Sequence, residues 1–220
     1  TSGAILAHPG LAGDTVELVP EIAEALPAFA SESAFEHWPG RLELRQADAR
    51  RFVTTSTNRY DVVVADLFHP GRDGAGGLYT VEHFAALKSR LAPGGICCQW
   101  LPLYQLNERT LRCIVRSYLT VFPEAHAFLL RLNVDTPVLG LIASTSPLRY
   151  PADWLARRVQ APELRAALQP LALTDTVSLL GLFVAGPEAL ATYAQTAPLN
   201  TDDRPRVTFS APTRNPRTDP

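Results

Sequence analysis

The stretch Tyr60–Pro70, YDVVVADLFHP, decides the fold of this chain. Its apolar run, Val62–Ala65, is too short for a helix of its own and too continuous for a half-exposed strand, so it predicts a buried central strand. Asp66 follows the run directly. Open α/β sheets bind their ligands at the carboxyl ends of parallel strands. The pattern therefore indicates Asp66 as the centre of a functional site.

Strand and helix patterns alternate through the first 122 residues. Strands are expected over 15–19, 42–48, 62–65 and 96–101, and helices over 2–8, 21–30, 80–91 and 107–121. A strand pair over 125–132 and 138–143 follows. The alternation predicts an α/β fold with a parallel, doubly wound sheet, and the strand pair is expected to close that sheet.

Length and charge limit the domain organisation and the partners. We expect one catalytic unit over 1–150, a helical and irregular C-terminal part of the same domain over 151–212, and a disordered tail over 213–220. The net charge is −2, and the chain has no run rich in Lys or Arg. This composition argues against a nucleic-acid partner and favours a small ligand.

The cysteines and the apolar segments indicate the compartment. Cys97, Cys98 and Cys113 are odd in number and two are adjacent, which fits neither a disulfide framework nor a spaced zinc site. A reduced, cytoplasmic compartment is expected. No apolar segment reaches the roughly 18 to 20 residues that span a bilayer. The start at Thr1, with small residues leading into an apolar run, is consistent with a fragment of a longer protein.

Three acids, Glu17, Asp48 and Asp66, follow three successive predicted strands. In a doubly wound sheet these strand ends lie along one edge, so the carboxylates would surround one crevice. The pattern is typical of a nucleotide site, with Glu17 accepting from ribose hydroxyls and Asp48 from an adenine amino group. The alternatives are a solvated strand end for Glu17, a helix cap for Asp48 and a turn for Asp66. The paired-glycine fingerprint is missing, and only Gly3 stands near the start.

The chain contains, in this order, VELVPEI, QADARRF, YDVVVADLFHP, LYTVEHF, LAPGGICCQW and LNTDDRP. Their order and spacing resemble the polyamine aminopropyltransferase (spermidine synthase) family over about residues 1–212, especially divergent bacterial members. The resemblance implies a Rossmann-like fold of the class I methyltransferase type. It also implies transfer of an aminopropyl group from decarboxylated S-adenosylmethionine to an amine, without a metal. Methylation by S-adenosylmethionine, another sulfonium-dependent reaction and a non-catalytic nucleotide-binding domain remain alternatives.

The resemblance assigns roles to individual residues. Asp66 matches the general base that takes a proton from the attacking amine. The residues expected at the adenosyl donor are Gly3, Glu17, Asp48 and Ala49. Those expected at the amine are His69, Tyr79, Gln99 and Asp202. Residues 71–79 match a mobile loop that closes over the substrates, although a plain surface connection also fits the glycines.

His69 departs from the family pattern. Spermidine synthases typically carry a second acid at this position, and a histidine does not hold an ammonium as a carboxylate does. Three roles stay open for His69: it could act as a base, bind an anionic group, or be a loop residue without a role. The resemblance therefore implies a small amine substrate without fixing which amine.

The resemblance also bears on assembly and location. It leaves open a homodimer and a fusion to membrane segments outside this chain, because divergent bacterial members are often fused to such segments. The expected location is the cytoplasm, or the cytoplasmic face of the membrane if the complete protein carries membrane helices.

Overall fold

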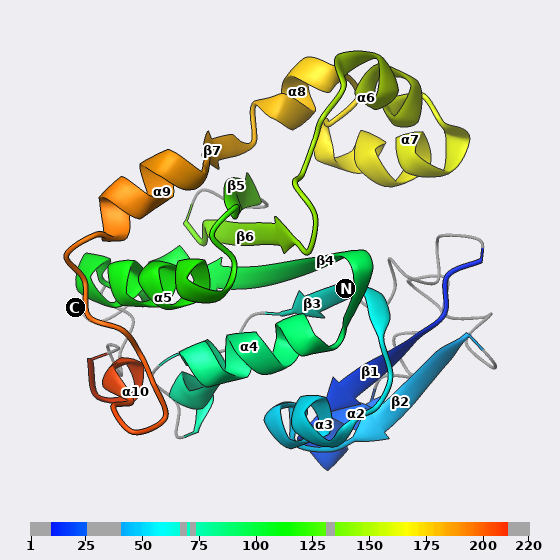
Figure 1. The fold of residues 1–220 in the computed structure, drawn as a ribbon. Helices are drawn as coiled ribbons and strands as arrows, with labels where there is room; N and C mark the ends of the chain where they lie inside the picture. Colours follow the sequence, from blue (N-terminus) through cyan, green and yellow to red (C-terminus); the bar gives the residue numbers. More distant parts are fainter. Residues whose placement is uncertain (1–9, 26–40, 67–69, 71–73, 131–134, 211–220) are drawn as a thin grey trace.

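The computed structural model describes residues 10–25, 41–66, 70, 74–130 and 135–210. Within these residues the strands form two sheets (Figure 1). The smaller sheet contains β1 (Gly13–Glu17) and β2 (Leu42–Gln46). The larger sheet has the order β3-β4-β6-β5-β7, with β3 (Tyr60–Ala65), β4 (Leu91–Pro102), β5 (His126–Leu130), β6 (Val138–Ser144) and β7 (Phe183–Ala185).

The sheets combine parallel and antiparallel pairing. β1 runs parallel to β2, and β3 runs parallel to β4. β6 lies antiparallel between β4 and β5, and the short β7 pairs antiparallel with β5. The predicted α/β fold and its antiparallel strand pair are therefore confirmed.

The described residues of the first half contain four α-helices, which begin where the sequence indicates, and two 3-10 helices, which were not predicted. They are α2 (Pro20–Ala25), α3 (Ala49–Thr55), the 3-10 helix η3 (Ala75–Tyr79), α4 (Val81–Ser89), the 3-10 helix η4 (Leu103–Gln105) and α5 (Glu108–Val121). Asp48, Thr80 and Asn107 are the N-cap residues of α3, α4 and α5. Each cap side chain accepts a backbone N–H three residues ahead, as N-cap residues commonly do.

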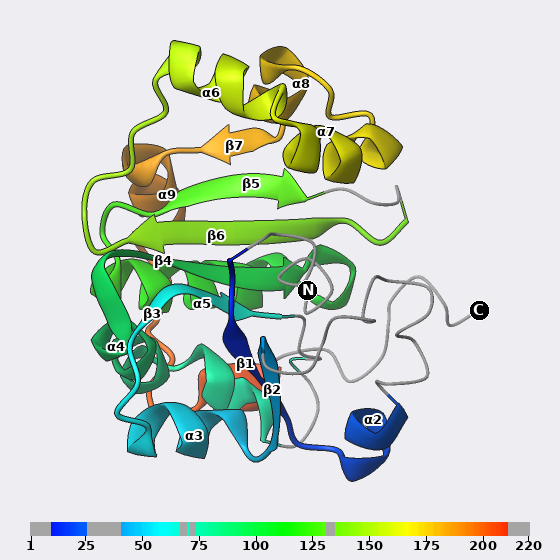
Figure 2. The ribbon, with the colours of Figure 1, turned by 90° about the vertical axis from the view of Figure 1, so that its right-hand side faces the viewer.

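The last third of the chain is mainly helical. It contains α6 (Ala152–Val159), α7 (Pro162–Leu168), η5 (Gln169–Leu171), α8 (Thr176–Leu180), α9 (Pro187–Ala194) and α10 (Arg206–Ser210). α6 to α8 lie at the end of the molecule opposite the β1–β2 sheet, whereas α10 returns to α5 and η3 (Figures 1 and 2). No helix in the described part of the chain is both long and apolar enough to cross a membrane. The expected domain boundary at residue 150 stays a prediction.

The core lies between the five-stranded sheet and the row of helices α4, α5 and α9. Phe84 and Tyr118 meet edge to face with their ring centroids 5.0 Å apart, and Phe122 stacks against Tyr118 at 4.9 Å. The Tyr118 hydroxyl donates to the Cys97 carbonyl oxygen over 3.1 Å. This bond satisfies the one polar atom that the aromatic cluster buries, and it fixes α5 to β4.

The predicted burial of the strand in Tyr60–Pro70 is wrong for part of its length. Val63 packs against the core, but Val62 is 56% and Val64 37% exposed. Side chains alternate along a strand, so Val62 and Val64 point to the opposite face, which is open to solvent at these positions. The β1–β2 sheet lies beside β3 (Figure 2), and the Tyr60 hydroxyl donates to Asp14 Oδ2 over 2.6 Å.

Smaller differences concern the element boundaries. β1 ends at Glu17, two residues earlier than expected, and β4 begins at Leu91 rather than Ile96. The added first residues of β4 include Pro93-Gly94-Gly95, where Gly94 has a φ of +77°. Part of the predicted glycine loop, Ala75–Tyr79, is a 3-10 helix. The helix predicted over 2–8 and the tail lie outside the described residues.

We predict that truncating a buried valine lowers the free energy of unfolding more than truncating an exposed one. Val115→Ala removes methyl groups that are 1% exposed in the core and should lower the free energy of unfolding by about 1.5 to 3 kcal/mol. Val62→Ala, at 56% exposure, should cost less than about 1 kcal/mol. Urea denaturation measures both. A Val62→Ala cost equal to that of Val115→Ala would mean that another segment covers β3 in the folded protein.

Candidate active site

Two of the predicted donor-side acids come from neighbouring strand ends. β1 and β2 are parallel, and Glu17 at the end of β1 pairs with Gln46 at the end of β2. Val19 N–H donates to Glu17 Oε1 over 2.8 Å, and Arg51 N–H donates to Asp48 Oδ1 over 2.7 Å. A carboxylate offers about four acceptor positions, so each acid keeps acceptor capacity beyond its local turn. The structure therefore brings Glu17 and Asp48 to one edge of the small sheet.

Asp48 is also a helix cap, as the alternative interpretation held. Its neighbour Ala49 is the first residue of α3. The helix start gives this pair a fixed orientation, because the cap bond locks the Asp48 side chain against the first turn. Gly3, the fourth residue expected at the donor, lies outside the described residues.

Asp66 follows the end of β3, and Gln99 lies on the neighbouring strand β4 beside that end. Gln99 stands opposite Ala65 in the parallel register, and the exposed Asp66 follows Ala65 directly. Gln99 is fully buried, and its Nε2 donates to the carbonyl oxygens of Ala65 at 3.4 Å and Trp100 at 3.0 Å. Its Oε1 has no hydrogen-bond partner among the described residues. A fixed buried acceptor therefore lies beside the strand end that carries Asp66.

The cysteines on β4 do not supply an acid or a nucleophile at this strand end. The pKa of Cys98 is raised to about 12, mainly by burial and in smaller part by the negative charge of Asp66, while a hydrogen bond with Trp100 opposes the rise. Burial likewise raises the pKa of Cys97 to about 12. Both groups are neutral thiols at physiological pH, and a thiol is a poor nucleophile. The exposed carboxyl group of Asp66, rather than a cysteine thiol, is therefore the candidate base at this strand end.

Asp202 contacts residues of α3 and α4. Its Oδ2 accepts from Arg50 Nη2, and its backbone N–H donates to Glu82 Oε2 over 3.1 Å. Arg50 Nη1 also donates to the Gly77 carbonyl oxygen over 2.9 Å. The hydrogen bond from Arg50 lowers the pKa of Asp202 below its usual value. The Asp202 carboxylate is thus ionised and engaged with a guanidinium.

Asn200 joins four elements from a fully buried position. Its Nδ2 donates to the Gly76 carbonyl oxygen over 3.1 Å, and its Oδ1 accepts from Val207 N–H over 3.1 Å. Its backbone N–H donates to Ser117 Oγ over 2.8 Å, and its carbonyl oxygen accepts from Val81 N–H over 3.0 Å. Asn200 therefore holds η3, α4, α5 and α10 together.

Tyr79 and His69 are the remaining residues expected at the amine. Tyr79 is 0% exposed and belongs to the hydrophobic core. His69 lies outside the described residues, as do its neighbours over 67–68 and 71–73. The expected contacts of Tyr79, His69 and Asp202 with an amine stay predictions.

His83 on α4 is a buried histidine that the sequence analysis missed. It is 3% exposed, and its Nδ1 has no hydrogen-bond partner among the described residues. Burial lowers the pKa of His83 to about 4, and the positive charge of Arg50 acts in the same direction. The imidazole is therefore neutral at physiological pH.

Arg50 and Asn200 were also missed as functional residues. Arg50 follows the expected donor pair Asp48-Ala49 directly, and this adjacency is the signal that could have singled it out. Asn200 was recognised only as part of a possible turn in LNTDDRP. Nothing in its spacing indicates that it is buried, because burial depends on α5 and η3, which lie far away in the sequence.

Comparison with known proteins identifies the class. Residues 16–134 match the family model of the spermine/spermidine synthase domain. This match covers more than half of the 220 residues, so the chain belongs to the spermine/spermidine synthase family.

The curated relatives are polyamine aminopropyltransferases. Polyamine aminopropyltransferase 2 of Hyperthermus butylicus is 30% identical over 155 residues, which are 70% of this chain and 49% of that protein. Polyamine aminopropyltransferase 2 of Pseudomonas aeruginosa is 28% identical over 174 residues, 76% of this chain and 48% of that protein. The chain thus spans about half the length of these relatives.

A solved structure supports the fold. The crystal structure of a spermidine synthase in complex with the transition-state analogue AdoDATO superposes with a TM-score of 0.66 at 16% identity, covering 88% of this chain and 67% of that one. The Rossmann-like fold expected from the resemblance is therefore confirmed, with a mixed sheet that does not close into a barrel.

We predict that Asn200→Ala strongly destabilises the fold. The change leaves the Gly76 carbonyl and the Val207 N–H buried without their side-chain partner, at a cost of about 2 to 4 kcal/mol in the free energy of unfolding. Chemical denaturation measures the loss. Thr201→Ala is the matched control, because its hydroxyl bonds only to the exposed Asp203 and its removal should cost less than about 1 kcal/mol. Similar losses in both variants would contradict the role of Asn200.

We predict that His83 makes the protein less stable as the pH falls from about 6.5 to 4. The unfolded chain binds a proton on this histidine near pH 6.5, whereas the folded protein does so only near pH 4. The free energy of unfolding should therefore fall by about 3 kcal/mol over this interval, and His83→Gln should abolish that part of the fall.

Urea denaturation of both proteins between pH 7 and 4 measures the difference. His126→Gln, on β5, is the control that should keep the contribution of His83. A difference between wild type and His83→Gln that does not change with pH would contradict the prediction.

Proposed function

We propose that this chain carries the catalytic site of an aminopropyltransferase, which moves an aminopropyl group from decarboxylated S-adenosylmethionine to a small amine. One observation carries the proposal: the exposed Asp66 ends β3 beside the buried Gln99, whose Oε1 lacks a partner among the described residues. Membership of the spermine/spermidine synthase family supports the same reaction.

The adenosyl donor would bind at the edge where β1 and β2 end. Glu17 would accept hydrogen bonds from the ribose hydroxyls, and Asp48 with Ala49 would meet the adenine ring, with Gly3 close by. The parallel register of β1 and β2 supports this arrangement, because it brings both carboxylates to one side of the sheet. The acceptor capacity that each carboxylate keeps fits hydroxyl and amino donors.

Asp66 would act as the general base. An aliphatic amine is an ammonium in water, so the carboxylate attracts it and then accepts one proton. The freed nitrogen lone pair attacks the methylene carbon beside the sulfonium. The new C–N bond forms while the C–S bond breaks, and the bonding pair returns to sulfur to give neutral methylthioadenosine. Because the sulfonium is already a good leaving group, positioning of the two substrates should dominate the rate.

Gln99 would orient the amine. Two hydrogen bonds from its Nε2 fix the amide, so its Oε1 faces in a defined direction. A buried acceptor without a partner is costly, and an amine N–H is a suitable donor for it. Tyr79, His69 and Asp202 would complete the amine pocket, although the ion pair with Arg50 occupies the carboxylate of Asp202 in this structure.

Methyl transfer from S-adenosylmethionine is the second candidate. His69 favours it, because His69 stands where spermidine synthases typically carry a second acid for the ammonium groups of the substrate. Methylation needs no such second contact. We further propose a cytoplasmic location, or the cytoplasmic face of a membrane if the complete protein has membrane helices, and leave a homodimer as a proposal.

The products distinguish the two reactions. The complete protein is incubated with each donor and a panel of amines, and the nucleoside products are separated by chromatography. Methylthioadenosine is the expected product with decarboxylated S-adenosylmethionine. Adenosylhomocysteine formed from S-adenosylmethionine would instead support methylation, and donor binding without either product would overturn both reactions.

We predict that Asp66→Asn lowers turnover by roughly two to four orders of magnitude, because the amide cannot accept the proton of the amine. Donor affinity, measured by calorimetry, should stay within a few-fold of wild type, since the donor contacts lie on β1 and α3. Asp61→Asn, at the exposed start of the same strand, is the control and should keep full turnover. Unchanged turnover in Asp66→Asn would rule out the assignment.

A further inference from the structure

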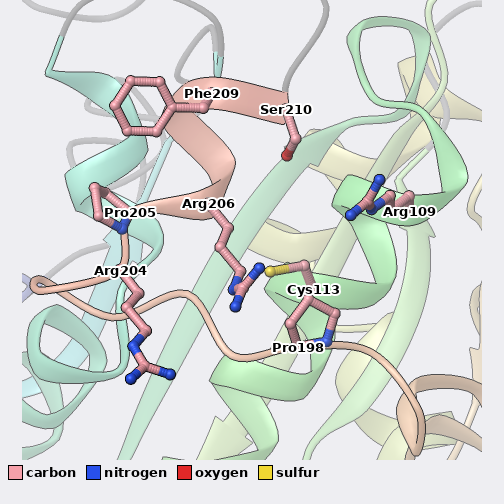
Figure 3. A pocket seen from close by; sticks show the side chains of 8 residues that line it. All are labelled: Arg109, Cys113, Pro198, Arg204, Pro205, Arg206, Phe209 and Ser210. Carbon is pink, nitrogen blue, oxygen red and sulfur yellow. The ribbon is translucent and has the colours of Figure 1, made fainter.

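A cavity of about 490 Å³ lies between α5 and the C-terminal segment that ends in α10 (Figure 3). Arg109 and Cys113 line it from α5, and Arg204, Arg206 and Phe209 line it from the C-terminal segment. None of the described residues expected at the donor or at the amine belongs to its lining. The volume falls within the range of small-molecule sites and is far larger than a single bound ion requires.

The cavity is positively charged without a matching acid. Arg109 and Arg206 reach into it from opposite walls (Figure 3), and neither forms an ion pair within the described part of the chain. The nearest carboxylate oxygen to Arg204 belongs to Asp203, at the marginal distance of 4.0 Å. No acidic residue lines the cavity among the residues described.

The thiol at the base of the cavity responds to these charges. Burial raises the pKa of Cys113, and the positive charges of Arg206 and Arg109 oppose that rise. Both guanidinium groups are therefore close enough to act on the same atom. Like charges that converge on one space repel each other, and an anion between them removes the repulsion. The whole chain has a net charge of −2, so the arginines give this cavity a charge opposite in sign to that of the chain.

An apolar rim accompanies the charge. Phe209 is 85% exposed, which is unusual for so large an apolar side chain, and Pro198 and Pro205 also line the cavity. Aromatic side chains stack on the flat rings of ligands. The rim therefore suits a ligand with a ring, and the arginines suit a ligand with an anionic group.

The walls of the cavity are held in place by the fold. Asn107 Nδ2 and Thr110 Oγ1, both at the start of α5, each donate to the Ser210 carbonyl oxygen over 3.2 Å. On its other side α10 packs closely on η3, since a Cβ placed on Gly76 would lie 2.2 Å from Thr208 Oγ1. The cavity is thus preformed, which lowers the entropic cost of binding.

We propose that this cavity binds a small organic phosphate that carries an aromatic or heterocyclic ring. Guanidinium groups bind phosphate oxygens in pairs of parallel hydrogen bonds, so Arg109 and Arg206 hold the phosphate from two sides. The ring packs on Phe209 at the rim. This binding is separate from the proposed transfer reaction and does not depend on it.

Calorimetric titrations in buffer of physiological salt concentration test the site with three probes: phenyl phosphate, inorganic phosphate and phenol. Phenyl phosphate should bind more tightly than inorganic phosphate, and phenol should not bind. Arg109→Gln and Arg206→Gln should each weaken both phosphates about tenfold or more. Phe209→Ala should weaken phenyl phosphate roughly three- to tenfold and leave inorganic phosphate unchanged.

Arg157→Gln is the matched control, because Arg157 lies on α6 at the far end of the molecule and should leave every affinity unchanged. Hydrogen exchange adds a second measurement, since phenyl phosphate should slow the exchange of α10 amides in wild type and not in Arg206→Gln. The proposal is overturned if no saturable binding occurs below about 10 mM, a weak affinity even for a fragment. It is equally overturned if Arg109→Gln and Arg206→Gln bind as tightly as wild type.

Discussion

The two hydrogen bonds of the Asn200 side chain are the interaction on which the arrangement of the site depends. It pairs the Gly76 carbonyl of η3 with the Val207 N–H of α10, in a position with no exposure to solvent. Neither element has the length to be stable alone, because short helices in water need tertiary contacts. A buried amide that satisfies a donor and an acceptor at once supplies such contacts, and it also sets where the following Asp202 meets Arg50.

Local signals in the sequence predicted local structure well. The helices predicted over 80–91 and 107–121 begin as expected, with Thr80 and Asn107 as their N-caps. The order of acids at strand ends likewise placed Glu17 beside Asp48, because parallel pairing brings such ends together. The helix starts could be predicted from residues within a few positions of each start. The neighbouring acids could be predicted from the general rule that parallel strands end at the same edge of a sheet.

Long-range pairing explains what the sequence did not predict. Asp202 and Arg50 are 152 residues apart, so no spacing rule connects them, and the pairing of this carboxylate with a guanidinium was not predicted. Val62 and Val64 belong to a continuous apolar run and are exposed, whereas Val63 packs against the core and Ala65 is buried. An apolar run shows that a segment forms a strand, but which of its faces is covered depends on elements elsewhere in the chain.

The two faces of α10 contact two different parts of the molecule. Val207 and Thr208 face Asn200 and η3, whereas Arg206 and Phe209 face the arginine-lined cavity. A five-residue helix has too few contacts of its own to move on one face without the other, so the same contacts that fix η3 also fix the cavity wall. Because α10 packs on η3, a ligand that rigidifies α10 should also restrict η3, the element that precedes α4 in the chain.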